Sequence, residues 1–570
     1  MSIQLSRFAS AYPPIPIPRQ SFYTYLVEQD TFDSNHPFTI NGQTGNIVTR
    51  GQLKERALRL AYGLRNAHKV GLEPLGRGST AIVVSPATDF YAVMMLGLGA
   101  AGIVCALANP AYTAPELAHA ITVSRASHVL AHASALPLVR ATLASLGRTP
   151  EDIRRTVVLV SPEAETPPED AAGWATLDTL VYDPVPGLPE RFDGAAADAT
   201  AFVYFSSGTT GLSKGVELSH ANVGANLAQM RAVHAYFQTN RDVTVTGIPL
   251  FHVLGGQTLI LFSLLRGVAV VLLPRVVPAE YLACIARYRV SVIITVPPIL
   301  LMLTNSPLVE QHDLSSVRVL SVGAAPVSPE MMLACERRFA RRGWRVSVAQ
   351  GYGMTELTAV ATYMPMESIA ARPTSIGWQL PNSEIRITDD EGNDLPVGEA
   401  GELWFRSPSV MKGYANNPKA TAETITPDGW LKSGDVALVD KDGYISITDR
   451  KKELIKYKAF QVAPAELEDV INAHPDVADC AVIGVYAKEQ ATELPKAYVV
   501  PKDARLLSGG DPRALIEGIH SFVAPRVAHF KYLRGGITLT AEIPKSASGK
   551  ILKRKLRELE SAQQAPVPKL

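Results

Sequence analysis

Cysteine is scarce in this sequence. Four cysteines occur among 570 residues, at Cys105, Cys284, Cys335 and Cys480, and no two of them form a CxxC pair. A disulfide framework and a cysteine-based zinc site are therefore not expected, and the composition is typical of a protein kept in a reducing compartment.

The chain also lacks an excess of charge of either sign. Its 55 Lys and Arg residues balance 54 Asp and Glu residues, which leaves a net charge of +1 with neutral histidines. We therefore do not expect nucleic acid or an anionic membrane surface as a partner. Residues 1–18 contain several prolines and no apolar core of the signal-peptide type, so secretion is not expected either.

One uncharged run, residues 91–108, is long enough to cross a bilayer. Three glycines, Gly97, Gly99 and Gly102, divide this run, and a turn at Asn109 and Pro110 ends it. We interpret the run as a short buried helix followed by a strand at residues 103–107, and we expect no membrane span.

Apolar runs of strand length recur along the chain and are separated by helical patterns. They lie at residues 80–84, 156–160, 201–205, 268–273, 290–296, 317–322 and 344–349. This alternation predicts an α/β fold with layered, mostly parallel sheets covered by helices. Ser328 followed by Pro329 predicts a helix start between the last two of these strands.

The pattern changes towards the C-terminal end of the chain. Short alternating segments at residues 384–388 and 401–405 predict a small β-rich lobe. Two short helices, opening at Pro464 and near Asp511, with strands near residues 480–485 and 496–500, predict a small α+β domain. We place the boundary between residues 1–449 and a mobile domain of residues 450–570, and we expect residues 561–570 to be an exposed coil.

A segment rich in glycine and hydroxyl side chains follows the strand at 201–205. It reads FSSGTTGLSKG, and its candidate phosphate-binding residues are Ser206, Ser207, Gly208, Thr209, Thr210 and Lys214. Glycines let the backbone approach an anion, and the hydroxyls and lysine add donors and charge, so the segment suits a polyphosphate. It is not a Walker loop, because the GxxxxGK[ST] spacing is absent. Taken alone, it could also be a plain Gly/Ser turn.

Further motifs follow this segment in a fixed order. They are GAAP at 323–326, QGYGMTE at 350–356, KSGD at 432–435, DRKKELIKYKAFQVAPAELE at 449–468 and PKSASGK at 544–550. The set resembles the adenylate-forming superfamily of acyl-CoA synthetases, luciferases and peptide-synthetase adenylation domains. The sequences of the last two motifs are most similar to those of 4-coumarate:CoA ligase-like enzymes. The resemblance spans residues 47–557.

This resemblance implies a two-step reaction. A carboxylate would attack ATP to give an acyl-AMP and pyrophosphate, and the acyl group would then pass to the thiol of coenzyme A, with ATP, Mg²⁺ and CoA as the required small molecules. The residues predicted to surround the nucleotide are Gly323, Ala324, Ala325, Gln350, Gly351, Tyr352, Gly353, Met354, Asp435 and Arg450. Within this set the resemblance implies that Tyr352 lies near adenine and that Asp435 and Arg450 bind the ribose. Thr355 would contact the α-phosphate, and Glu356 would hold Mg²⁺.

The small domain carries several expected functional residues. The resemblance implies that Lys550 bridges carboxylate and phosphate during adenylation, that Lys456 and Gln461 assist it, and that Lys452 is the hinge. Lys458 and Ala459 would border the CoA channel. Ala459 departs from the glycine usual at its position, and its Cβ could narrow that channel.

The acid pocket is expected beside His252, in PLFHVLGG, which the resemblance implies is a gate between pocket and thiol tunnel. Its predicted walls, residues 251–257, 296–298, 323, 351–353 and 359–361, are small or apolar, which favours a hydrophobic aryl or medium-chain fatty acid. Trp378 stands where this family commonly has a small residue, and the sequence does not tell whether it reaches the pocket.

Two other functional interpretations remain open. The enzyme could load an acyl-adenylate onto a carrier-protein thiol in trans, or the chain could be a non-catalytic nucleotide-binding module. The last three residues, Pro568, Lys569 and Leu570, resemble a peroxisomal import signal, so a peroxisomal receptor is a candidate partner and both peroxisome and cytoplasm are candidate locations.

Overall fold

The computed structural model describes most of the chain. The described residues are 6–160, 173–181, 187–206, 213–325, 327–450, 453–457, 460–487, 492–527, 529–546 and 549–564. Several predicted site residues lie outside these ranges: Ser207, Gly208, Thr209, Thr210, Lys452, Lys458, Ala459, Pro568, Lys569 and Leu570. The side chains of Arg450, Lys456 and Gln461 are also outside the description.

A seven-stranded sheet forms the first part of the large domain, in the order β19-β9-β8-β5-β4-β6-β7. Its strands are β4 (Thr80–Val84), β5 (Val104–Ala108), β6 (His128–His132), β7 (Val157–Val160), β8 (Thr200–Ser206), β9 (Lys214–Ser219) and β19 (Gly413–Tyr414). The strands from β8 to β7 pair in parallel, as predicted, whereas β8 and β9 form an antiparallel hairpin. Because β8 and β9 flank FSSGTTGLSKG, this hairpin fixes both ends of the predicted phosphate segment.

Two smaller sheets continue the large domain. The first has the order β10-β11-β2-β3 and the second is the parallel sheet β12-β13-β14. Their strands are β2 (Pro37–Asn41), β3 (Ile47–Thr49), β10 (Val243–Val245), β11 (Ala269–Leu272), β12 (Val292–Thr295), β13 (Val319–Val322) and β14 (Ser347–Gln350). The predicted parallel architecture is confirmed here, and Ser328 caps the helix between β13 and β14 by accepting a hydrogen bond from the Met331 amide.

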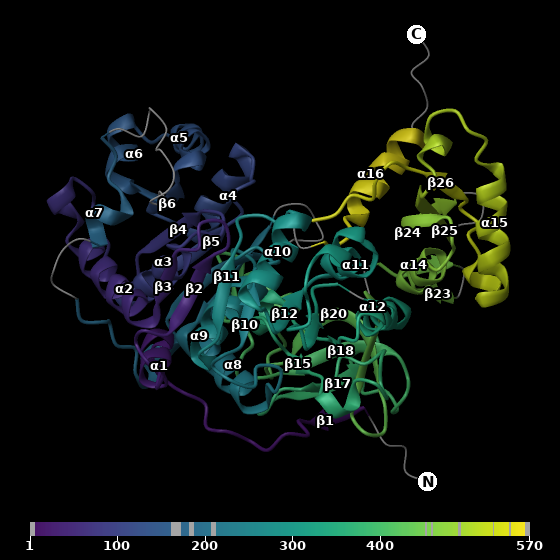
Figure 1. Cartoon of the computed structure of the whole chain (residues 1–570), viewed down its shortest axis with the longest axis horizontal. Coiled ribbons are helices and arrows are strands. Elements are labelled where there is room, and N and C mark those ends of the chain that lie inside the picture. Colours follow the sequence, from purple (N-terminus) through teal and green to yellow (C-terminus); the bar gives the residue numbers. More distant parts are fainter. Residues whose placement is uncertain are drawn as a thin grey trace.

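Helices cover these sheets (Figure 1). Those of the large domain are α1 (Phe22–Glu28), α2 (Arg50–Arg65), α3 (Tyr91–Ala101), α4 (Ala114–Ser124), α5 (Leu136–Ser145), α6 (Pro150–Thr156), α7 (Leu177–Val181), α8 (His220–Val233), α9 (Ser263–Arg266), α10 (Pro278–Tyr288), α11 (Pro297–Asn305), α12 (Pro329–Arg341) and α13 (Pro418–Thr424). A π-helix, η5 (Leu254–Phe262), runs directly into α9. The uncharged run is the buried helix α3 followed by β5, and no helix within the described residues is long and apolar enough to cross a membrane.

The predicted β-rich lobe is a five-stranded antiparallel sheet in the order β1-β17-β18-β20-β21. Its strands are β1 (Arg7–Ala9), β17 (Glu384–Thr388), β18 (Gly401–Arg406), β20 (Leu431–Val439) and β21 (Ile445–Arg450), and a separate pair is β15 (Thr362–Tyr363) with β16 (Trp378–Gln379). The N-terminal strand β1 closes one edge of the sheet, which the sequence did not predict.

The C-terminal elements form a group of their own at the right of Figure 1. They are β22 (Ile455–Tyr457), β23 (Phe460–Val462), α14 (Pro464–Asn472), β24 (Val477–Ala487), β25 (Thr492–Pro501), α15 (Arg513–Val523), β26 (Ile537–Leu539) and α16 (Lys553–Gln564). Buried residues from Ile455 to Leu533 form a hydrophobic cluster separate from that of the large domain. The boundary at residues 449 and 450 stays a prediction.

The predicted coil at residues 561–570 is wrong in its first part. Helix α16 extends to Gln564, so residues 561–564 are helical. The cause is the amphipathic spacing of the segment that precedes them, in which Leu556 packs into a small cluster with Ile483 and Tyr498.

Candidate active site

A cavity of about 1200 Å³ lies between the large domain and the C-terminal residues 545–546 and 549–552. It opens at the carboxyl ends of β13 and β14, the edge where parallel sheets generally bind ligands. Fifteen of the predicted site residues line it: Ser206, Lys214, His252, Gly323, Ala324, Ala325, Gln350, Gly351, Tyr352, Gly353, Met354, Thr355, Glu356, Asp435 and Lys550. Motifs far apart in the sequence therefore meet at one cavity.

The register of β13 and β14 brings two of these motifs side by side. Val322 is opposite Gln350, so the GAAP and QGYGMTE segments leave neighbouring strand ends. A side chain at Gly353 has no room, because an added Cβ would lie 1.6 Å from the Ala359 carbonyl oxygen. Ala324 has a positive φ of 68° and Ala359 one of 97°, so the backbone of this wall is strained at two alanines.

Tyr352 and Asp435 join the large sheets to the β-rich lobe. The Tyr352 hydroxyl donates a hydrogen bond of 2.6 Å to Oδ2 of Asp435, which is buried. The ring of Tyr352 stacks on Phe405 at 5.9 Å with an interplanar angle of 11°. Asp435 lies opposite Arg450 in the β20–β21 register, so the two predicted ribose residues occupy paired positions.

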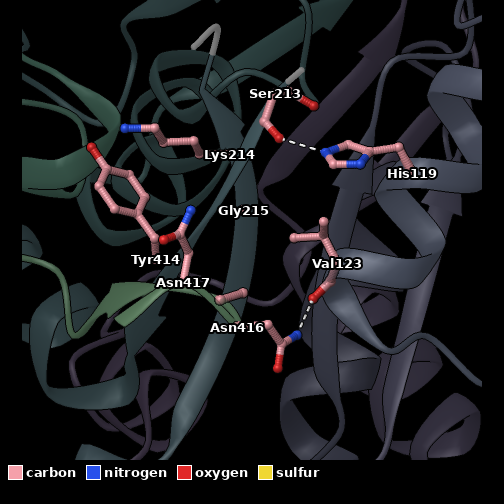
Figure 2. A pocket seen from close by; sticks show the side chains of 9 residues that line it. His119, Val123, Ser213, Lys214, Gly215, Tyr414, Asn416 and Asn417 are labelled. Atoms are coloured by element: carbon pink, nitrogen blue, oxygen red, sulfur yellow. Dashed lines mark hydrogen bonds between the residues drawn. The ribbon is translucent and has the colours of Figure 1, made fainter. Parts of the chain in front are cut away.

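Glu356, Tyr414 and Lys214 form a second polar group in the cavity. The Tyr414 hydroxyl donates a hydrogen bond of 2.9 Å to Oε1 of Glu356, whose side chain is buried. Burial and the adjacent Glu356 charge raise the pKa of Tyr414 well above its usual value, so its hydroxyl keeps the donated proton. The Lys214 ammonium lies 4.4 Å from the centre of the Tyr414 ring, a cation–π contact that both residues make in Figure 2.

A smaller hollow of about 390 Å³ lies at the base of the predicted phosphate segment. Figure 2 shows His119 reaching from α4 to Ser213, where its Nε2–H donates a hydrogen bond of 2.8 Å to the Ser213 carbonyl oxygen. On the same side the Asn416 amide donates to the Val123 carbonyl at 2.8 Å. These contacts fix the start of β9, and with it Lys214.

His252 lies beside Lys550. Burial, and then the positive charge of Lys550, lowers the pKa of His252 to about 4, so its ring is neutral at pH 7. Its Nδ1 accepts a hydrogen bond of 3.3 Å from the Leu254 amide. The proton of the neutral ring therefore sits on Nε2, which makes that atom a donor.

A tight turn carries Lys550. The Lys550 amide donates to Oγ of Ser546 at 3.1 Å, and the Gly549 amide donates to the Ser546 carbonyl at 2.8 Å. Gly549 has a φ of 81°, and an added Cβ would lie 2.7 Å from Cγ of Pro298. The turn thus rests directly on the N-terminal end of α11.

The described residues contain no group of three or more His, Cys, Asp or Glu side chains able to hold a metal ion. Glu356 offers one carboxylate. That single hard oxygen donor fits a Mg²⁺ ion that takes its other ligands from phosphates and water.

Comparison with known families agrees with this geometry. Residues 28–415 match the model of the AMP-binding enzyme family, and residues 466–550 match that of the AMP-binding enzyme C-terminal domain. The chain belongs to the AMP-binding enzyme family. The predicted resemblance to adenylate-forming enzymes is therefore confirmed.

Relatives of this AMP-binding enzyme match it over nearly their whole length. One, from Dictyostelium discoideum, is named "Probable 4-coumarate–CoA ligase 1"; it is 34% identical, over 97% of this chain and 97% of its own. Among solved structures, ATP-bound MatB from Rhodopseudomonas palustris has a TM-score of 0.79 at 27% identity, covering 96% of this chain and 99% of its own. A benzoate CoA ligase from Burkholderia xenovorans has a TM-score of 0.77 at 25% identity, covering 94% and 99%. This AMP-binding enzyme is an acid–CoA ligase of the AMP-forming class.

The walls of the acid pocket of this AMP-binding enzyme agree only partly with the prediction. Residues 251–254, Pro297, Pro298, Ala359 and Val360 line the cavity as expected, whereas residues 255–257, Val296 and Ala361 do not. The sequence missed another part of the lining, which comprises Met230, His234, Tyr236, Thr258, Ile294, Leu301, Tyr363 and Met364. All of these residues lie outside the motifs, so no local signal pointed to them.

Trp378 does not line this cavity. Its indole N–H donates to the Asp442 carbonyl at 3.1 Å, and its ring packs between Tyr12 and Tyr444, at 5.7 Å and 4.6 Å. Trp378 therefore anchors the N-terminal segment to the β-rich lobe.

Proposed function

We propose that this enzyme joins a hydrophobic carboxylic acid to coenzyme A, with an aryl acid as the preferred class and a medium-chain fatty acid as the second. ATP would activate the acid as an acyl-AMP, with release of pyrophosphate, and CoA would then displace AMP. The names of the relatives, 4-coumarate–CoA ligase and benzoate CoA ligase, favour an aryl acid. The apolar walls formed by Phe251, Ile294 and Val360 favour a hydrophobic one.

One observation carries the proposal. Lys550, from the C-terminal turn, lies close enough to His252 to depress its pKa, in a cavity that also contains Lys214 and Asp435. Adenylation brings a carboxylate against a phosphate, so it requires positive charge at the point where the two anions meet. Lys550 and Lys214 would supply that charge from two sides of the cavity.

His252 would contribute a neutral donor. Because its Nδ1 already accepts the Leu254 amide, Nε2–H is the group available to the acid. A hydrogen bond from a neutral ring orients a carboxylate without neutralising it as an ion pair would, and so leaves its oxygen nucleophilic.

Mg²⁺ would enter with ATP and would be held by Glu356, with Tyr414 fixing the carboxylate through its hydroxyl. The ion would supply charge neutralisation at the phosphates. Thr355, beside Glu356, would contact the α-phosphate, and Asp435 with Arg450 would bind the ribose.

Exchange of labelled pyrophosphate into ATP, dependent on acid and independent of CoA, tests the first step. We expect exchange with cinnamic or benzoic acids above that with octanoic acid, followed by AMP release when CoA is added. Lys550→Ala should abolish exchange while leaving the conversion of added acyl-AMP to acyl-CoA much less affected. Equal loss of both steps would contradict the role assigned to Lys550.

Exchange without CoA-dependent turnover would move the conclusion to an enzyme that loads a carrier-protein thiol in trans. In that case Ala459→Gly is the variant to test, because a Cβ at this position is expected to narrow the thiol channel.

A further inference from the structure

Tyr414 lies on the wall between the large cavity and the smaller hollow at the base of the phosphate segment. Tyr414 and Lys214 line both spaces, whereas Glu356 lines only the larger one. Figure 2 shows the Tyr414 ring beside the Lys214 side chain. The sequence predicted roles for Lys214 and Glu356 but none for Tyr414, which stands outside the motifs.

The backbone around Tyr414 fixes the position of its ring. Tyr414 belongs to the short edge strand β19, which pairs with β9, the strand that Lys214 begins. The Tyr414 amide donates to Oγ1 of Thr421 at 2.9 Å, and the Ala415 amide donates to the Gly215 carbonyl at 2.7 Å. The ring is therefore held in a constant position relative to the end of the phosphate segment.

The hydroxyl of Tyr414 holds the carboxylate that is expected to bind the cation. Its hydrogen bond of 2.9 Å to Oε1 is the one hydrogen bond to the Glu356 carboxylate among the described residues. The segment before β19 also holds the Glu356 backbone, because the Met411 amide donates to the Glu356 carbonyl at 2.9 Å. A hydrogen bond to Oε1 orients the carboxylate and leaves Oε2 for a cation.

The ring of Tyr414 holds the lysine of the phosphate segment. The Lys214 ammonium lies 4.4 Å from the ring centre, and within the described part of the chain no carboxylate pairs with it. An aromatic face attracts a cation without neutralising its charge as an ion pair would. The ammonium thus keeps its charge and its N–H donors for a phosphate.

We infer that Tyr414 is a positioning residue that holds the phosphate-binding lysine and the metal-binding carboxylate at one fixed spacing, so that the enzyme recognises ATP and its divalent cation as a unit. This inference rests on the proposed function, and it goes beyond that function by naming the residue that couples the two groups. Loss of a hydrogen-bond partner of a metal ligand typically lowers metal affinity about tenfold or more. Loss of a cation–π contact at a partly exposed site has a smaller effect, a factor of about three.

The test measures the Kd of ATP by isothermal titration calorimetry in the absence of acid, once with Mg²⁺ and once with EDTA. The Kd in EDTA divided by the Kd in Mg²⁺ gives the factor by which the cation strengthens ATP binding. Tyr414→Phe keeps the ring and removes the hydroxyl, whereas Tyr414→Leu removes both.

Tyr444 provides a matched control, because it is a buried tyrosine that does not line the cavity. Its hydroxyl shares a hydrogen bond of 2.6 Å with the Ser368 hydroxyl, and its ring lies 3.9 Å from the guanidinium carbon of Arg372. Tyr444→Phe and Tyr444→Leu therefore remove the same two kinds of interaction at a distant place. Thermal unfolding of all four variants shows whether they are folded.

We expect Mg²⁺ to strengthen ATP binding to the wild-type enzyme. In Tyr414→Phe this factor should fall about tenfold, with the Kd in EDTA unchanged. In Tyr414→Leu the factor should fall equally, and the Kd in EDTA should rise about threefold as well, because Lys214 is no longer held. Both Tyr444 variants should keep the wild-type values.

Several outcomes would overturn the inference. An unchanged factor in Tyr414→Phe would show that the hydroxyl does not support the cation site, and an equal loss with and without Mg²⁺ would show a general structural role. Equal Kd values in EDTA for Tyr414→Phe and Tyr414→Leu would remove the role of the ring. The same losses in the Tyr444 variants would show that any such change in packing weakens ATP binding. Failure of the wild-type enzyme to bind ATP at all would instead refute the proposed function, and the inference would fall with it.

Discussion

Lys553 and Glu468 form a buried ion pair behind the turn that carries Lys550. The Lys553 ammonium lies 3.0 Å from Oε1 of Glu468 and 3.4 Å from Oε2 of Glu453, and the Lys553 side chain is only 6% exposed. The same Glu468 oxygen accepts the Val482 amide at 2.7 Å. The pair therefore fixes the start of α16, three residues after Lys550, to α14 and β24.

The magnitude of its effect can be worked from these contacts. Removing one partner of a buried pair costs about 3–5 kcal/mol, because the other charge is left uncompensated. Glu468→Gln keeps an acceptor for Val482, and Lys553 keeps Glu453, so we expect a loss of about 2 kcal/mol. Lys553→Met leaves two carboxylates without their cation and should cost about 3 kcal/mol. The double variant buries no unpaired charge at either position and should lose about 2 kcal/mol or less.

Urea unfolding followed by a probe in the C-terminal domain measures these losses in the full chain. Pyrophosphate exchange, compared with conversion of added acyl-AMP to acyl-CoA, measures the effect on Lys550. We expect the single variants to lose exchange more than thioester formation, because the resemblance implies that Lys550 acts only in the first step. A double variant that is as unstable as the sum of the single variants would refute the account of a coupled pair.

Three further predictions follow from the cavity and its rim. Gly353→Ala should cost about 3 kcal/mol of folding free energy and about 100-fold in pyrophosphate exchange, measured by urea unfolding and by the exchange assay, since its Cβ would collide with the Ala359 carbonyl. Asp435→Asn should raise the apparent KM for ATP about tenfold or more and leave the KM for the acid unchanged; an equal rise in both would contradict a ribose contact. Desolvation and the charges of Glu468, Glu330 and Glu466 raise the pKa of Asp469 to about 7. This carboxyl therefore destabilises the fold increasingly as pH rises from about 4 to about 7, so Asp469→Asn should raise Tm at pH 8 and not at pH 4. The change should be small, because Asp469 is an exposed residue and solvent screens its charge.

Much of the fold could be predicted from apolar runs of strand length. The runs at 80–84 and 317–322 contain β4 and β13, because strands buried on both faces appear in the sequence as nearly continuous apolar runs. β6 escaped prediction because histidines stand at both of its ends, His128 and His132, and both are buried in the structure. Its signal in the sequence is only three apolar residues long.

The charged segment near the C-terminus shows where sequence reasoning reaches its limit. A run containing Lys553, Arg554, Lys555 and Arg557 is typical of a solvated surface, whereas the structure buries the Lys553 side chain. Its partners Glu453 and Glu468 lie about 100 and 85 residues earlier, so their approach depends on how α14, α16 and the segment before β22 pack together. No local pattern contains that information.

The residues of the candidate site also fall into two groups, those that could be predicted from the sequence and those that could not. Residues in contiguous motifs, such as 350–356, could be found because consecutive residues at a strand end must face the same cavity. His234 could not, since its surroundings come from η5, β15 and the segment after α8, which no motif links. The lining at the far end of the pocket depends on packing between elements that are distant in the sequence. The residues predicted to bind the nucleotide lie instead in short contiguous motifs.

His252 connects these two parts of the cavity. Its pKa depends first on burial by the large domain and second on the charge of Lys550, which belongs to the C-terminal turn. If the turn withdraws after adenylation, the second cause disappears, so the pKa of His252 rises towards its usual value of about 6.5. The ring would then remain neutral at pH 7 in both arrangements, and its Nε2 proton would be available to the acyl carbonyl throughout the reaction. A neutral donor held by the Leu254 amide can therefore serve both steps, whereas Lys550 can serve only the one in which the turn is closed.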